Sequence, residues 1–349
     1  MASYVPAITA EAPEPCTAKT APAPVDTASS SEATTAPAWF GRALDRVRAY
    51  VSDLPPELRA RAAAVASAFA CRNGGTSLAT AFTAPGAAPY PRLTDAYRDD
   101  LGLSPEDPRL DAIGEGAVHL YLHVRAQDDL IDDPATWGPS FTYAAEAFAA
   151  ASHRAFATAL PGEARFFAFR EAVMLAFLGA ATWELDVMRG EPAALEPRAM
   201  DEAPARLGHK LLPMAIPLGA LALVAGKPEH LDPLLHFASA LGEGIQIVND
   251  VLNVAEDHLA GRSTPVLSWL YAGGRAEAAT PAGLVRALLL SDPALERAQD
   301  RARAAITRAG SLAKSLPAPS LAAATLAATD LVERAPARLL VLTLGGRGA

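Results

Sequence analysis

Two groups of carboxylate and amide side chains stand within otherwise apolar stretches of this chain. Their members recur at short intervals: Asp128, Asp129 and Asp132 form the first group, and Asn249, Asp250, Asn253 and Asp257 form the second. On an α-helix this spacing predicts one stripe of Asp128 and Asp132, and another of Asn249, Asn253 and Asp257. Carboxylates in apolar surroundings need a cation, and hard oxygen ligands suit Mg²⁺. Two facing stripes could hold Mg²⁺ bound to a diphosphate.

The elements that must position these groups are predicted to be helices. Hydrophobic residues make up 51% of the 349 residues, and no segment alternates with the period of a strand. We therefore expect an all-α fold, a single large helical bundle over residues 38–349, of a kind whose core commonly holds metal sites. The predicted helices span about 39–53, 55–72, 92–101, 108–132, 139–159, 163–189, 201–225, 229–256, 264–272, 281–290, 293–315 and 318–345.

Composition also predicts the state of two further segments: the N-terminal one lies outside the bundle, and an apolar one lies inside it. Residues 1–37 are rich in Ala, Pro, Thr and Ser, lack the features of a secretory signal, and are predicted to be disordered. The apolar stretch 211–226 is shorter than the ~20 residues that cross a bilayer. It also contains Pro213 and Pro217, so we expect a buried helix and no membrane span.

Charge and cysteine content narrow the function classes. The net charge of −9 argues against a nucleic-acid partner, because proteins that follow a phosphate backbone are usually basic over the binding face. Cys16 and Cys71 form neither a metal-binding spacing nor a disulfide framework. They suit a reducing compartment, and a cytoplasmic location is the expectation.

The two groups, in this order and on predicted helices, resemble the motifs of the class I isoprenoid synthase superfamily, which includes polyprenyl diphosphate synthases and class I terpene synthases. Residues 128–132, DDLID, match its first motif, DDxxD. Residues 241–267, LGEGIQIVNDVLNVAEDHLAGRSTPVL, resemble the polyprenyl synthase stretch in which a Gln precedes a second acidic motif and a Gly-basic-x-Thr run follows. The pair His209-Lys210 resembles the helix whose lysine contacts diphosphate.

The resemblance implies the helical isoprenoid synthase fold, a prenyl diphosphate substrate, a possible homodimer, and Mg²⁺, as three ions with bound diphosphate. It implies as metal ligands Asp128, Asp129, Asp132, Asn249, Asp250, Asn253 and Asp257, all but Asp250 also assigned to catalysis. It implies as substrate-binding residues Arg206, Lys210, Gln246 and Arg262. An apolar wall must keep water from the allylic cation, and the candidates for it are Tyr121, Phe167 and Trp183.

The chain departs from the prenyl synthase pattern at its anion-binding motifs. Such enzymes usually carry Gly-Lys-x-x-Arg-Pro before the first acidic helix and Arg-Arg-Gly after it. Here the nearest counterpart of the first is 74–79, GGTSLA, and no arginine follows the DDxxD motif before Arg154. The trio Asn249, Asn253 and Asp257 also resembles the cyclase motif of Asn, Ser or Thr, and Glu.

These departures favour terpene synthase chemistry, in which an allylic diphosphate ionises, the cation cyclises or loses a proton, and diphosphate is released. The alternative is a prenyl diphosphate synthase that condenses the allylic diphosphate with isopentenyl diphosphate. A third reading is a non-catalytic partner subunit of such an enzyme. Among the individual residues, Arg206, Lys210 and Arg262 could instead be surface or snorkelling bases. His119 and His123, one helical turn apart, could bind a metal or be packed histidines.

Overall fold

The computed structural model describes residues 37–72, 77–83, 90–132, 134–188, 196–272, 280–290 and 293–345. Every regular element within these ranges is a helix and none is a strand, which confirms the predicted all-α fold. The segment predicted to be disordered, 1–37, lies outside the described residues except for Pro37. The described chain forms two compact units, one comprising residues up to Pro91 and Leu110–Thr158, the other comprising Arg92–Arg109 and Ala159 onward.

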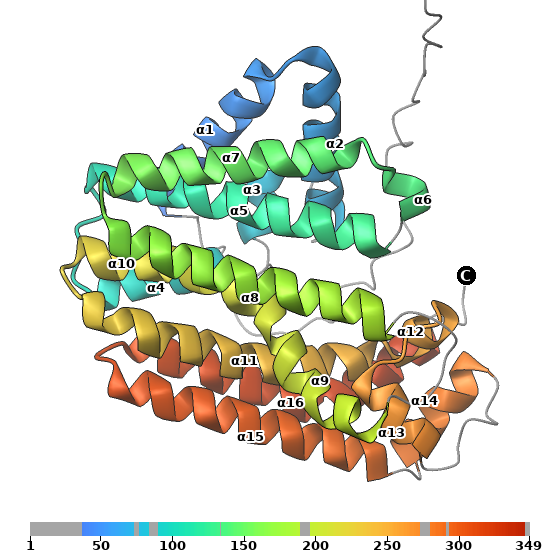
Figure 1. The fold of residues 1–349 in the computed structure, drawn as a ribbon. Coiled ribbons are helices and arrows are strands. Elements are labelled where there is room, and N and C mark those ends of the chain that lie inside the picture. The colour runs from blue at the N-terminus through green and yellow to red at the C-terminus, as the bar shows by residue number, and fades with distance from the viewer. Residues whose placement is uncertain are drawn as a thin grey trace, which may run out of the picture. The chain divides into compact units, whose positions relative to one another are not determined.

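The first unit carries the helix of the DDxxD motif. Its helices are α1 (Ala38–Asp53), α2 (Pro56–Arg72), α3 (Leu78–Thr83), α5 (Pro108–Asp132, in this unit from Leu110), α6 (Pro134–Trp137) and α7 (Phe141–Ala159). Helices α5 and α7 run side by side (Figure 1) because a glycine lets them approach: a Cβ on Gly116 would lie 2.9 Å from the Phe156 ring. The Ser152 hydroxyl donates to the Gly116 carbonyl at 2.9 Å.

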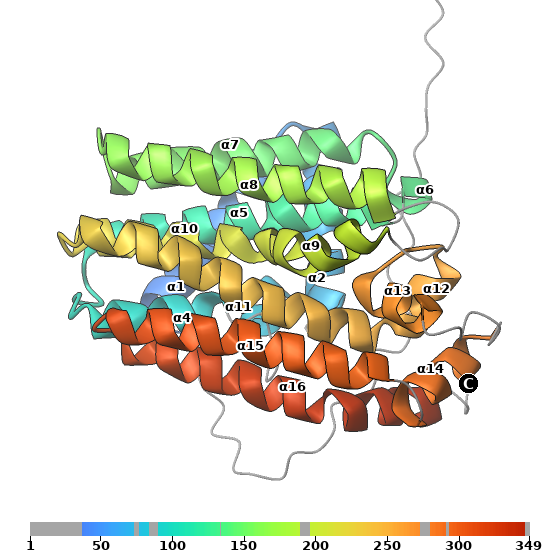
Figure 2. The ribbon, with the colours of Figure 1, turned by 60° about the horizontal axis from the view of Figure 1, so that its bottom comes forward.

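The second unit carries the helix of the second acidic group. Its helices are α4 (Tyr90–Asp100, in this unit from Arg92), α8 (Ala164–Met188), α9 (Pro197–Gly208), η1 (His209–Met214), α10 (Ala215–Val224), η2 (Pro228–His230), α11 (Leu231–Leu252), α12 (Val254–Leu259), α13 (Pro265–Ala272), α14 (Pro281–Leu290), α15 (Pro293–Ser315) and α16 (Pro319–Gly345). Helices α11, α15 and α16 pack alongside one another, as both ribbon views show (Figures 1 and 2). A Cβ on Gly244 would lie 2.6 Å from Ile306, so this packing requires a glycine.

A second close approach brings the end of α9 onto α11. A Cβ on Gly208 would lie 2.6 Å from the backbone nitrogen of Glu243. Only glycine permits this separation without a shift of the backbone. The consequence for the site is that His209 and Lys210, which follow Gly208 directly, begin η1 against α11.

The predicted single helix over 201–225 is wrong, because the chain forms α9, the 3-10 helix η1 and α10 in succession. Pro213 lies in η1, and proline has no N–H for the α-helical hydrogen bond and its ring clashes with the carbonyl four residues earlier. The predicted helix over 229–256 is also wrong in its continuity, because α11 ends at Leu252 and α12 begins at Val254. The short helices α3 and α6 were not predicted.

Two segments of the second unit are long and apolar enough to cross a membrane by length and composition, Ala164–Met188 and Arg198–Val224. The most apolar window of Arg198–Val224 is 72% buried within the protein, as in the core of a helical bundle, and the segment overlaps the stretch 211–226, which was predicted to be buried. The corresponding window of Ala164–Met188, which is helix α8, is only 33% buried. Helix α8 therefore leaves an apolar surface exposed.

Candidate metal and diphosphate site

The first acidic group occupies the last turn of α5. The side chain of Asp128 is 25% exposed, whereas that of Asp129 is 1% exposed. Asp132 is the last residue of the helix, and its side chain lies outside the described residues. Within the motif, therefore, Asp128 is open to solvent and Asp129 points into the protein.

A base that the sequence analysis did not single out contacts both aspartates. Arg125 Nη1 lies 3.1 Å from Asp128 Oδ2, and Arg125 Nη2 lies 2.7 Å from Asp129 Oδ1. The three residues are spaced so that they meet on one side of the helix. A guanidinium group presents several N–H donors in a plane and can serve two carboxylates at once.

The second acidic group spans the junction of α11 and α12. Asn253 lies between the two helices with φ −99° and ψ 9°, but the helical four-residue hydrogen bonds continue across it: the N–H of Asn253 donates to the Asn249 carbonyl at 2.9 Å, and the N–H of Asp257 donates to the Asn253 carbonyl at 2.8 Å. Asn249 and Asn253 are exposed, while Asp250 and Asp257 are buried. The three residues of the predicted stripe, Asn249, Asn253 and Asp257, thus differ in exposure, and their assignment as metal ligands stays a prediction.

Asp250 is the centre of the buried side of this group. Gln246 Nε2 donates to Asp250 Oδ1 at 3.1 Å, while Oδ2 is buried without a hydrogen-bond partner among the described residues. Burial raises the pKa of Asp250 well above its usual range, and the negative charges of Asp257 and Glu184 act in the same direction. Burial and nearby negative charges disfavour an ionised carboxylate, so binding of a proton or a cation to Asp250 is favourable.

Lys210 and Arg262 are the bases of this buried cluster. Lys210 Nζ lies 2.6 Å from Glu184 Oε2, and the Lys210 charge partly offsets the rise in the Asp250 pKa. Arg262 Nη1 lies 3.3 Å from Asp257 Oδ1. The structure therefore brings together, within the second unit, Lys210, Gln246, Asp250, Asp257 and Arg262 from the predicted site, and it adds Glu184.

The Gly-Arg-Ser-Thr run after α12 has a structural role that its composition explains. Gly261 has a φ of +67°, which favours glycine, and its N–H donates to the His258 carbonyl at 3.2 Å. The N–H of Arg262 donates to the Asp257 carbonyl at 2.9 Å, which completes a Schellman cap of α12. This turn directs the Arg262 side chain back to the carboxylate of the residue that its backbone caps.

Arg206 lies on the surface and is separate from this cluster. Its side chain is 50% exposed, 3.3 Å from Glu202 Oε2, and its guanidinium stands 5.6 Å from the centroid of the Trp183 ring. The predicted contact of Arg206 with diphosphate therefore stays a prediction, whereas the alternative reading as a surface ion pair matches these contacts.

Several other candidates prove to be parts of the packed interior of the first unit. His123 Nδ1 lies 2.9 Å from the Ala145 carbonyl oxygen, and His119 is fully buried beside the Tyr50 and Phe148 rings. Tyr121 packs on Phe69, with ring centroids 4.9 Å apart. These contacts match the reading of His119, His123 and Tyr121 as packed side chains.

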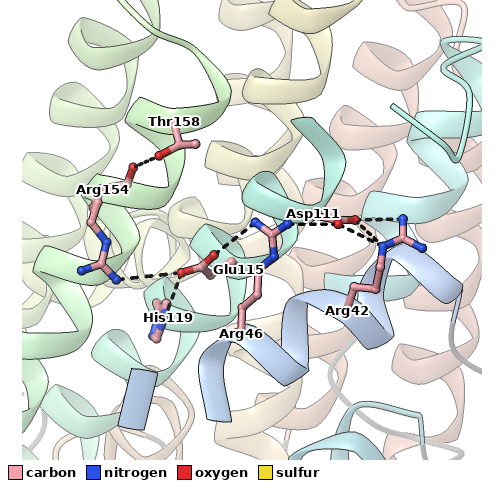
Figure 3. A network of polar contacts seen from close by, with 7 residues as sticks. All are labelled: Arg42, Arg46, Asp111, Glu115, His119, Arg154 and Thr158. Carbon is pink, nitrogen blue, oxygen red and sulfur yellow. Dashed lines mark hydrogen bonds and ion pairs between the residues drawn. The ribbon is translucent and has the colours of Figure 1, made fainter. Parts of the chain in front are cut away.

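A network of charges surrounds His119. Figure 3 shows Arg46 of α1 between Asp111 and Glu115 of α5, with Arg42 of α1 on the other side of Asp111 and Arg154 of α7 on the other side of Glu115. Asp111 is held closely by Arg42, at 2.9 Å, while the guanidinium nitrogens of Arg46 and Arg154 lie 3.8 Å and 4.0 Å from Glu115. The network joins α1, α5 and α7 within the first unit.

Each acidic group, taken within its own unit, fits Mg²⁺ as an ion that is shared with a phosphate ligand. Within the described residues no three His, Cys, Asp or Glu side chains converge as a site that holds a metal by itself. Mg²⁺ is commonly bound through one or two carboxylates, with waters and substrate phosphates completing its shell. The partly exposed Asp128 and the unpartnered Oδ2 of Asp250 suit that mode of binding.

Comparison with solved structures decides the fold. A geranylgeranyl pyrophosphate synthetase from the archaeon Geoglobus acetivorans matches with a TM-score of 0.65 and 17% identity, over 84% of this chain and 98% of that one. The chain has the class I isoprenoid synthase fold. A geranylgeranyl pyrophosphate synthase from Lactobacillus brevis matches with a TM-score of 0.59 and 17% identity, over 86% of this chain and 95% of that one.

A third match is a polyprenyl synthase from Caulobacter crescentus, a complex with calcium and isoprenyl diphosphate. Its TM-score is 0.57 at 15% identity, over 85% of this chain and 97% of that one. No family model matches the sequence. A search of curated proteins also finds no relative. The predicted resemblance and fold are confirmed, and the fold is that of prenyltransferase enzymes.

Proposed function

We propose that this protein is a Mg²⁺-dependent prenyltransferase that condenses an allylic prenyl diphosphate with isopentenyl diphosphate. The observation that carries the proposal is the buried cluster of the second unit. There Lys210 on η1 and Asp250 and Asp257 around the end of α11 come together, although they are far apart in the sequence. The similar structures named above, two geranylgeranyl pyrophosphate synthases and a polyprenyl synthase, support elongation over cyclisation.

The chain's own groups divide the work of binding and charge stabilisation. When Mg²⁺ is bound, it neutralises the charge that moves onto the diphosphate as the allylic C–O bond breaks. Within each unit, the carboxylates of its own acidic group, such as Asp128 in the first and Asp250 in the second, would bind the metal. Lys210 and Arg262, which lie among the carboxylates of the second unit, would donate hydrogen bonds to the diphosphate oxygens.

A second candidate, terpene synthase chemistry, is favoured by the sequence of the anion-binding motifs. Isopentenyl diphosphate needs charge-assisted contacts of its own, and the usual basic motifs before and after the first acidic helix are missing. The amide side chains of Asn249 and Asn253, which resemble the cyclase motif, also favour terpene synthase chemistry. The third reading, a non-catalytic partner subunit, would leave the carboxylates of both groups without a catalytic purpose.

One incubation separates the three functions. The purified protein is mixed with Mg²⁺ and geranyl, farnesyl or geranylgeranyl diphosphate, with and without isopentenyl diphosphate, and both phases are analysed by mass spectrometry. A longer diphosphate formed only with isopentenyl diphosphate supports the proposal. A hydrocarbon or alcohol with free diphosphate, formed without it, means terpene synthase chemistry instead, and no product under any condition supports the silent subunit.

Two variants connect the activity to the acidic groups. Asp128→Ala and Asn249→Ala each remove a proposed metal ligand, and each is expected to abolish turnover while leaving the helical content unchanged by circular dichroism. Wild-type activity in either variant contradicts the assignment of that residue. A cytoplasmic location and a homodimer belong to the same proposal.

A further inference from the structure

The contact of Arg125 with the first acidic motif places a fixed positive charge where the proposed metal must bind. The guanidinium is 28% exposed and lies within 3.1 Å of one carboxylate oxygen each of Asp128 and Asp129. All three residues belong to α5, so the contact does not depend on how any other helix is placed.

The burial of Asp129 explains why a cation is needed there before any metal arrives. Its side chain is 1% exposed, and an ionised carboxylate in such a place is costly unless a charge or hydrogen bonds compensate it. Asp128 adds a second negative charge on the neighbouring position. A single guanidinium that contacts both carboxylates lowers the repulsion between them.

The positive charge of Arg125 also disfavours the binding of Mg²⁺ to Asp128. An ion coordinated by Asp128 would stand close to the guanidinium, and two positive charges at a separation of a few ångströms repel strongly at the edge of a protein. Metal binding at Asp128 therefore requires Arg125 to swing away or to give up part of its contact.

We propose that Arg125 is a built-in counter-cation of the DDxxD motif, which Mg²⁺ displaces and which therefore sets the metal concentration at which the motif is loaded. This inference rests on the proposed function, because it takes the motif to be the metal site of that reaction. Arg125 is a positioning residue in this account, since it acts through the carboxylates.

Direct metal binding tests the inference without any substrate. Mn²⁺ serves as the probe, alone and without diphosphate, and the free ion is measured by electron paramagnetic resonance. Arg125→Gln removes the competing charge and should tighten Mn²⁺ binding roughly tenfold. The matched control is Arg198→Gln, which breaks an exposed pair with Glu202, also four residues apart on one helix, and should leave the affinity unchanged.

A second pair of variants assigns the effect to the motif. In an Asp128→Asn background the Arg125→Gln change should give no gain, because the competed ligand is gone. Unchanged or weaker Mn²⁺ binding in Arg125→Gln overturns the inference, and so does an equal gain in both backgrounds. If Arg125→Gln does not fold, Arg125→Lys tests the same point, since a lysine can serve only one carboxylate well and should give a smaller gain.

The outcome is separable from that of the proposed function. A protein that makes no product but binds Mn²⁺ more tightly as Arg125→Gln contradicts the function and retains the inference. A protein that elongates prenyl diphosphates but shows no change in Mn²⁺ affinity contradicts the inference alone.

Discussion

Lys210 Nζ and Glu184 Oε2 are 2.6 Å apart in the second unit, and both side chains are mostly buried. Lys210 is the base that the motif resemblance assigns to diphosphate, so its charge is already engaged by a carboxylate of α8. Glu184 also contributes to the raised pKa of Asp250. The pair therefore restrains Lys210 and adds a negative charge beside the proposed diphosphate position.

The first prediction removes that charge. Glu184→Gln keeps the shape and a hydrogen-bond acceptor for Lys210 but frees its charge for diphosphate. We expect the KM for the allylic diphosphate to fall several-fold, with a smaller change in kcat, as determined by steady-state kinetics. Glu171→Gln, an exposed change on the same helix, is the control and should alter neither constant. A rise in KM, or weaker metal binding, would mean that Glu184 itself holds the metal.

The second prediction concerns the stability cost of Asp250. Its pKa is raised in the folded state, so the folded protein holds a proton more tightly than the unfolded chain, and stability falls as pH rises from the unfolded value near 3.9 toward the folded one. Asp250→Asn removes this penalty. We expect the melting temperature in EDTA to rise by about 1–2 °C at pH 7, as for roughly 1 kcal/mol in a chain of this size.

The same variant should lose Mg²⁺-dependent turnover, because an amide is a weaker ligand than a carboxylate. Differential scanning calorimetry and the product assay measure the two effects on one preparation. A variant that melts lower than the wild type in EDTA would contradict the view that the buried Asp250 is strained without its cation.

Local sequence patterns predict some elements of this fold and miss others. The helix predicted over 108–132 has the bounds of α5, because a long apolar run with Pro at its first position is a local signal. The breaks at Pro213 and Asn253 were missed because an apolar run continued on both sides. Pro213 was visible in the sequence, whereas the turn at Asn253 depends on how α11 and α12 pack.

In the candidate site, too, some contacts have a local sequence signal and others do not. Arg125 stands three and four residues before the aspartates it contacts, so the spacing alone could have revealed it. The pairing of Lys210 with Glu184 joins two helices and has no local signal. The burial of Asp250 next to the exposed Asn249 could not be read from an acidic motif either, since all its members have similar polarity.

The third prediction is a pH dependence of stability. Burial lowers the pKa of His119 to about 3, and the Arg154 charge acts in the same direction. In the unfolded chain the His119 imidazole is protonated below about pH 6.5, whereas in the folded protein it stays neutral. The free energy of unfolding therefore falls as pH drops below about 6.5. Between pH 6.5 and pH 5 this amounts to roughly 2 kcal/mol. The raised pKa of Glu115, which lies 3.9 Å from His119, opposes the loss at lower pH.

His119→Leu tests this dependence by urea unfolding at pH 7 and pH 5. The leucine cannot be protonated, so the variant should lose less stability between the two values than the wild type does. His236→Leu, at a side chain that is 61% exposed, is the control and should behave as the wild type. Equal pH sensitivity of His119→Leu and the wild type would show that another group governs the acid response.

The fourth prediction concerns the apolar surface of α8 and the proposed homodimer. Leu175, Leu178 and Leu185 are 62%, 41% and 39% exposed, and their spacing of three and seven places them on one side of the helix. An apolar helix stripe of this kind is the surface that a second copy of the chain would bury. Leu178→Asp should therefore convert a dimer to a monomer in light scattering after size-exclusion chromatography. The control is Leu326→Asp, on α16 and 72% exposed, which should leave the dimer intact. A wild type that is monomeric at all concentrations, or a Leu178→Asp variant that stays dimeric, would contradict a dimer interface at this stripe.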